Sequence, residues 1–168
     1  FGRWGRDTFI SLPGLCIALN DWRLFRLAID TMLDDFKDGF FPNIGEGKQA
    51  AYNSVDAPLW FFWTLQQYAY INDARKEVWQ AYSHIMRNIL ENFSEGVSNV
   101  RMDSNFLLWQ GEEGKALTWM DAIIDGNPVT ARKGYAVEIN ALWYNAVMFY
   151  RELAKLQCED GEIAKWDE

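Results

Sequence analysis

Most of this chain alternates between two kinds of helical segment, and that alternation limits the folds that it can adopt. In one kind, apolar residues lie on every side of the predicted helix, which is typical of a helix buried among others. In the other kind, apolar residues recur every three or four positions with charged residues opposite them, which is typical of a helix with one face in solvent. Helices of these two kinds pack in layers. We therefore predict an all-α fold of about five to six antiparallel helices, in which inner and outer helices alternate.

The helix boundaries follow from turn and capping signals. Asn-Asp pairs at positions 20–21 and 72–73 are short breaks between apolar patterns, and Pro58 is tolerated in the first turn of a helix. Pro13 and Gly14 weaken the first helix and predict a kink. The predicted helices cover residues 6–19, 22–36, 56–71, 74–93 and 135–156, and a sixth begins near Asp160.

Two long segments, residues 37–55 and 94–133, show no sustained helical pattern. Unpatterned connections of this length in a compact domain are usually functional. Within the second segment, residues 98–102 and 106–110 predict two short strands around a polar turn, a small hairpin between the fourth and fifth helices. If successive helices run antiparallel, both long segments lie at one end of the fold, together with the N-termini of the first, third and fifth helices.

Four carboxylates are predicted at that end: Asp7, Asp56 and Glu138 near helix N-termini, and Asp121 in the second long segment. A helix N-terminus favours a carboxylate, so helix stabilisation explains Asp56 and Glu138 equally well. An ion pair with Arg6 is the plain alternative for Asp7, and a solvated loop acid is the alternative for Asp121. Trp119, close to Asp121, offers the apolar surface that a proton-donating carboxyl needs. Paired carboxylates perform glycoside hydrolysis, one as proton donor and the other activating water or attacking the sugar.

The composition narrows the class of partner. Nine tryptophans are several times the usual share for 168 residues, and an indole is costly to bury completely because its N–H needs a partner. One interpretation is a tryptophan-rich core. The other is a sugar-binding surface, on which indoles stack against pyranose rings beside carboxylates. The net charge of −8 argues against nucleic acid as a partner, since a phosphate backbone binds a basic surface.

The remaining composition disfavours several kinds of site. Cys16 and Cys158 lie in apolar helical patterns, so we expect buried thiols in a reducing, cytoplasmic compartment rather than a disulfide. His84 is the only histidine and has polar neighbours, so we expect it at the surface, and a histidine-based metal site or a Ser-His-Asp triad is disfavoured. We expect no metal and no cofactor. No segment reaches the roughly 18 to 20 apolar residues of a membrane span, so no membrane partner is expected.

Four separated motifs resemble one known family. They are WGRDTFISLPGL at 4–15, FPNIGEG…YNSVDAPLWF at 41–61, TWMDA at 118–122 and PVTARKGYAVEINALWYNA at 128–146. They run through essentially the whole chain in the family's order, and together they closely resemble the amylo-α-1,6-glucosidase domain of glycogen debranching enzymes. That family is similar in architecture to glucoamylases. The resemblance therefore implies an (α/α)6 toroid of inner and outer helices, with the sugar site where the loops gather.

The resemblance also implies a reaction and a set of site residues. Asp121 would be the general acid of an inverting hydrolysis that removes α-1,6-linked glucose at branch points of glycogen or a related α-glucan. Arg6 and Asp7 match a WxRD element that holds the terminal glucose in related enzymes. The other substrate-binding residues implied by the motifs are Trp4, Asn53, Asp56, Trp119, Arg132 and Glu138. Trp60 is either a further stacking residue or part of the core.

The family carries its general base downstream of these motifs, and a full toroid has about twice as many helices as predicted here. We therefore expect residues 1–168 to be a partial catalytic domain, truncated at both ends and inactive alone for lack of the base. Uncovered apolar faces of inner helices predict self-association. The alternatives are a non-catalytic α-glucan-binding module and a related glucoamylase-like or trehalase-like hydrolase.

Overall fold

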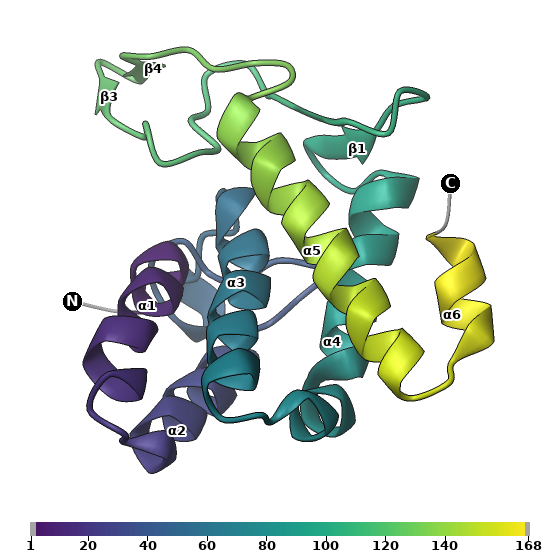
Figure 1. Cartoon of the computed structure of the whole chain (residues 1–168). Coiled ribbons are helices and arrows are strands. Elements are labelled where there is room, and N and C mark those ends of the chain that lie inside the picture. The colour runs from purple at the N-terminus through teal and green to yellow at the C-terminus, as the bar shows by residue number, and fades with distance from the viewer. Residues whose placement is uncertain (1–2, 167–168) are drawn as a thin grey trace.

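The computed structural model describes residues 3–166, which form six α-helices with two small sheets (Figure 1). The helices are α1 (Gly5–Leu12), α2 (Trp22–Leu33), α3 (Asp56–Ile71), α4 (Arg75–Glu95), α5 (Val137–Leu156) and α6 (Asp160–Lys165). The antiparallel strand pairs are β1 (Val100–Met102) with β2 (Leu108–Gln110), and β3 (Ile123–Ile124) with β4 (Asn127–Pro128). The prediction of a mostly helical chain with a hairpin between the fourth and fifth helices is confirmed.

The helices α1, α3 and α5 pack side by side, with α3 between the other two. Ten of the sixteen residues of α3 are buried, as its all-round apolar sequence predicts. By contrast, α2 buries a single stripe that includes Phe25 and Ile29, and α4 buries a stripe that includes Val78 and Met86. α4 packs across both α3 and α5, and α6 packs against α5. The predicted contrast is therefore confirmed for the buried α3 and the amphipathic α2 and α4. It is wrong for α5, which buries seven of its twenty residues, about the same share as the seven of twenty-one in α4.

The first predicted helix is divided at Pro13. α1 ends at Leu12, and the chain continues as a π-helical turn from Pro13 to Ile17, in which the N–H of Ala18 donates to the Pro13 carbonyl at 2.9 Å. Proline has no N–H to donate and its ring collides with the preceding turn, so the helical hydrogen-bond pattern changes at this residue. The predicted weak point is confirmed.

Aromatic packing holds the loop between α2 and α3 in the core. Phe41 is fully buried, and its ring lies 4.7 Å from that of Phe9 in α1 and 5.1 Å from that of Phe61 in α3. The N–H of Gly5 donates to the Pro42 carbonyl at 2.9 Å, and a Cβ on Gly5 would lie only 2.6 Å from that oxygen. A glycine is therefore required where α1 begins, and the N-terminus of α1 is fixed against the loop that leads into α3.

At the opposite end, a triangle of polar side chains joins α2, α3 and α4. The hydroxyl of Tyr68 in α3 accepts a hydrogen bond from Arg26 Nη2 at 3.2 Å and donates one to Glu77 Oε1 at 3.0 Å. Arg26 of α2 and Glu77 of α4 also form an ion pair with each other. A single tyrosine of the buried helix α3 thus connects the amphipathic helices α2 and α4.

A second triangle of the same three residue types joins the next set of three helices, α4, α5 and α6. Tyr150 accepts from Arg87 Nε at 3.2 Å and donates to Glu162 Oε2 at 2.6 Å, while Arg87 Nε and Glu162 Oε2 are 3.1 Å apart. In both cases the arginine precedes the tyrosine helix and the glutamate follows it. The two successive sets of three helices therefore share one packing arrangement.

One prediction about the cysteines is wrong. Cys16 is buried, as expected, but Cys158 is exposed, because α5 ends at Leu156 and Cys158 lies in the following turn with a φ of +58°. The apolar pattern of α5 stops where the chain turns toward α6. His84 is exposed, as predicted. Among residues 3–166, no helix combines the length and the apolar character that crossing a bilayer requires.

We expect Tyr150→Phe to lower the free energy of unfolding by about 1–2 kcal/mol, because the fully buried hydroxyl bonds to two charged partners. Tyr70→Phe is the matched control: Tyr70 also donates to a glutamate, Glu152, but its side chain is 44% exposed. Its change should stay below about 0.5 kcal/mol. Urea unfolding followed by circular dichroism measures both variants, and equal losses would contradict the role given to the triangle.

Alkaline pH should weaken the same packing. Burial and the hydrogen bond to Glu162 raise the pKa of Tyr150, and burial and the charge of Asp30 raise the pKa of Tyr82. The unfolded chain loses these protons near pH 10, at about the ordinary tyrosine pKa, whereas the folded chain keeps them to higher pH. Their contribution to stability is thus complete below about pH 10 and is lost as the pH rises further. Unfolding free energies measured between about pH 8 and pH 11 test this, and a decline as steep in the Tyr82→Phe, Tyr150→Phe double variant as in the wild type would contradict it.

Candidate active site

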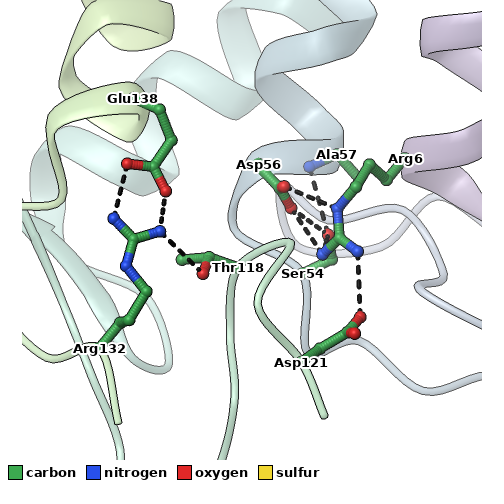
Figure 2. Close-up of polar contacts among 8 residues, drawn as sticks. All are labelled: Arg6, Ser54, Asp56, Ala57, Thr118, Asp121, Arg132 and Glu138. Carbon is green, nitrogen blue, oxygen red and sulfur yellow. Dashed lines mark hydrogen bonds and ion pairs between the residues drawn. The ribbon is translucent and has the colours of Figure 1, made fainter. Parts of the chain in front are cut away.

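Arg6 lies at the centre of a polar cluster where the N-termini of α1 and α3 meet (Figure 2). Its Nε donates to Asp56 Oδ2 at 2.7 Å and its Nη2 donates to Asp56 Oδ1 at 3.1 Å, which makes a two-pronged ion pair. Asp56 is the first residue of α3 and is 1% exposed, and Arg6 is 8% exposed. Buried charges of this kind are tolerated only when they are paired and hydrogen-bonded. The pair therefore fixes α1 against α3.

Ser54 completes the buried pair. Its hydroxyl donates to Asp56 Oδ1 at 2.5 Å and accepts from Arg6 Nη2 and from the backbone N–H of Ala57, each at 3.3 Å. The bond to Ala57 satisfies one of the free N–H groups in the first turn of α3. Sequence reasoning missed Ser54, although a serine three residues before an N–H in the first turn of a helix is a capping signal that would have found it.

The segment Thr118–Asp121 brings a second acid to Arg6. Arg6 Nη1 donates to Asp121 Oδ2 at 3.0 Å. The Asp121 side chain is 37% exposed, whereas that of Asp56 is 2% exposed. The backbone before the segment is also attached to α3, because the N–H of Val55 donates to the Leu117 carbonyl at 2.9 Å. A buried arginine thus holds a solvent-accessible acid in place.

A second arginine holds the same segment from its other end. Arg132 pairs through both of its terminal nitrogens with Glu138 in the first turn of α5, with Nη2 and Oε2 2.7 Å apart. Arg132 Nη1 also donates to Thr118 Oγ1 at 3.3 Å. The side chain of Gln110, in β2, donates to the Arg132 carbonyl at 3.0 Å and fixes the loop that carries it. Figure 2 shows Thr118 beside the guanidinium of Arg132 and Asp121 below that of Arg6.

Arg6 remains positively charged in this setting. Burial lowers its pKa, but the hydrogen bonds and charges of Asp56 and Asp121 outweigh burial and raise the pKa above its ordinary value. One guanidinium therefore faces two carboxylates, which leaves the cluster one negative charge in excess. Such a cluster can stabilise positive charge that develops on a sugar ring, or can take up one proton and deliver it.

The structure gathers three of the four predicted acids around this segment and places the fourth elsewhere. Asp56 and Asp121 share Arg6, and Glu138 is joined through Arg132 to Thr118. The remaining acid, Asp7, lines a groove of about 970 Å³ between α1 and α2 together with Trp4. Successive residues of a helix point about 100° apart, so Asp7 cannot follow Arg6 into the cluster.

The aromatic and amide residues predicted for the site differ in their surroundings. Trp119 is 54% exposed, so its indole leaves the Asp121 carboxyl open to solvent rather than burying it. Asn53 is half-buried, and its Oδ1 has no hydrogen-bond partner among the described residues. Trp60 is half-buried against the core with its ring 5.4 Å from that of Trp63, which favours the core interpretation.

Comparison with known proteins identifies a family and a curated relative of this chain. All of residues 1–168 match the family described as amylo-alpha-1,6-glucosidase. A Saccharomyces cerevisiae protein named glycogen debranching enzyme is 26% identical to this chain over an alignment 232 positions long. The alignment covers 98% of this chain and 15% of the yeast protein. The chain thus spans about 15% of the length of this curated relative. No solved structure matches the chain.

The family match covers all four motifs, and with them both arginines and the segment that they hold. The chain belongs to the amylo-α-1,6-glucosidase family.

Proposed function

We propose that this chain provides the proton-donating side of a glycoside hydrolase site that removes α-1,6-linked glucose at branch points of glycogen or a related α-glucan. Asp121 protonates the glycosidic oxygen in an inverting reaction, and a general base from outside residues 1–168 activates the attacking water. The chain alone is then inactive. Family membership and one geometric observation support this proposal.

The geometric observation is that Asp121 is both accessible and held. A proton donor has to reach the substrate and keep a fixed direction toward it. The Asp121 side chain is 37% exposed, and its Oδ2 accepts a hydrogen bond from Arg6. Its Oδ1 has no hydrogen-bond partner among the described residues. Asp56 and Glu138 instead use both of their oxygens in two-pronged pairs with arginine. Asp121 is thus the acid of this cluster with an oxygen available to a substrate.

Neighbouring groups support a sugar-binding role. We propose that Trp119 stacks on a pyranose ring, since its indole is more than half exposed. The Asn53 amide oxygen has no protein partner among the described residues. Arg6 uses four of its five N–H groups in the described residues, and the fifth is on Nη1, beside Asp121. These groups line the proposed glucose subsite.

The other predicted residues have different proposed roles. Asp56, Arg132 and Glu138 hold the walls of the subsite through the two arginine pairs. Trp4 and Asp7 contact the substrate from the groove between α1 and α2. This assignment keeps the charged pairs intact and leaves the exposed groups to the sugar.

We also propose that the six helices form part of an (α/α)6 toroid and of a larger catalytic domain. The recurrence of the arginine–tyrosine–glutamate triangle supports a repeated two-helix unit. Leu24 and Leu27 on α2 and Tyr144 on α5 are exposed. The remaining helices of such a ring, or a second copy of the chain, would cover these side chains.

A non-catalytic α-glucan-binding module is the second candidate. The exposed indole of Trp119 favours it, because stacking holds a sugar without any proton transfer. A glucoamylase-like or trehalase-like hydrolase would use the same acid on a different glucoside.

We expect Trp119→Ala to weaken the binding of a branched α-glucan oligosaccharide about five- to tenfold, because the stacking surface is lost. Tyr144→Ala is the matched control, since Tyr144 is an aromatic residue of α5 that is 68% exposed and lies outside the cluster. Isothermal titration calorimetry measures both affinities. An unchanged affinity of the Trp119 variant would remove this residue from the site.

Asp121→Asn should lower kcat for glucose release from a branched α-glucan by at least about 100-fold in the complete protein, because the amide cannot donate the proton. Sugar affinity should change little. Asp103→Asn, which removes a hairpin acid paired with Arg101, is the control and should retain full activity. Normal turnover of the Asp121 variant would rule out the hydrolytic role of this acid and leave the binding module.

A further inference from the structure

The guanidinium of Arg6 divides its contacts unequally between two acids. Asp56 receives Nε at 2.7 Å and Nη2 at 3.1 Å, and its side chain is 2% exposed. Asp121 receives only Nη1, at 3.0 Å, and its side chain is 37% exposed. The buried acid therefore accepts two hydrogen bonds from Arg6, and the accessible acid accepts one.

This inequality matters because an arginine normally favours the ionised form of a neighbouring carboxyl. A group that donates a proton must spend part of the reaction cycle protonated. If Arg6 faced Asp121 alone, its full positive charge would oppose protonation. With Asp56 already paired to it at 2.7 Å, the field at Asp121 is that of a neutral pair with one N–H directed at the carboxyl.

We propose that Arg6 is a positioning residue for Asp121, and that buried Asp56 neutralises its charge so that Arg6 can orient the acid without fixing it in the ionised state. The proposal rests on the proposed function of Asp121, and it explains why a proton donor is attached to an arginine. It gives Asp56 a role that neither helix stabilisation nor sugar contact supplies.

The surroundings of Asp121 support this division of roles. The charged groups that face it are Arg6 from α1 and, through Arg6, Asp56 from α3. Arg132 of the loop and Glu138 of α5 lie beyond Thr118 and neutralise each other. Ser54 donates to Asp56 Oδ1 at 2.5 Å and so helps to hold in place the acid that balances Arg6. The backbone position of the segment is set separately, by the bond of Val55 to Leu117 and of Arg132 to Thr118.

The test measures proton uptake by Asp121 directly, by carbon-13 NMR of its carboxyl in the 168-residue chain without sugar. Asp56→Asn keeps the size of the side chain and one of the two hydrogen bonds from Arg6, because the amide oxygen still accepts, but it removes the balancing charge. We expect the pH at which Asp121 takes up its proton to fall by about one unit, a tenfold loss of proton affinity. Asp103→Asn removes an equivalent charge in the hairpin and should shift it by less than about 0.3 unit.

If Asp121 of the Asp56→Asn variant takes up its proton at an unchanged or higher pH, the proposal is overturned, because a purely structural role of Asp56 does not lower that pH.

If the Asp56→Asn variant loses its helical circular dichroism, the Arg6→Lys variant tests the proposal instead. Lysine keeps the charge beside Asp56 but has no second arm for Asp121, so amides at 119–122 should exchange about tenfold faster while those of α3 stay protected. Unchanged exchange at 119–122 would overturn the proposal. Because no sugar is present, these outcomes are independent of whether Asp121 catalyses hydrolysis.

Discussion

The rest of the site depends on the buried ion pair between Arg6 and Asp56. The two residues are 8% and 1% exposed, and their side chains meet at 2.7 Å where α1 and α3 begin. A charge at this depth is stable only with its partner and its hydrogen bonds in place, so both helices have to start within reach of each other. Gly5 and Phe41 make this approach feasible, the first by allowing close backbone contact and the second by holding the intervening loop in the core.

The two ends of the helical layer use polar contacts for different purposes. At one end, Tyr68 and Tyr150 each join three successive helices through a closed triangle with an arginine and a glutamate. At the other end, Arg6 and Arg132 hold an irregular segment on which Asp121 remains accessible. The triangles therefore join helices to one another, whereas the arginines position a segment that carries an exposed acid and an exposed indole.

Local features were predicted well because short-range physics sets them. The predicted limits of the third helix, residues 56–71, agree with α3, and Asp21 caps α2 by accepting from the N–H of Leu24 at 2.9 Å. The hairpin was predicted in place, though its strands are shorter than expected. The end of the fifth helix was predicted in place, at residue 156, but Cys158 was predicted to be buried and instead lies exposed in the turn beyond it.

The sequence by itself determined the helical class, the contrast between the buried α3 and the amphipathic α2 and α4, the two long loops and the motifs that mark the family. Only the tertiary structure decided which side chains meet. Arg6 reaches Asp56 across 50 positions and Asp121 across 115, whereas Asp7, one residue away, lies in a different groove. Spacing predicts the face of a helix on which a residue lies, but a contact between distant segments depends on how whole helices pack. The pairing of one arginine with two acids is such a contact, because it forms only when α1, α3 and the loop before α5 come together.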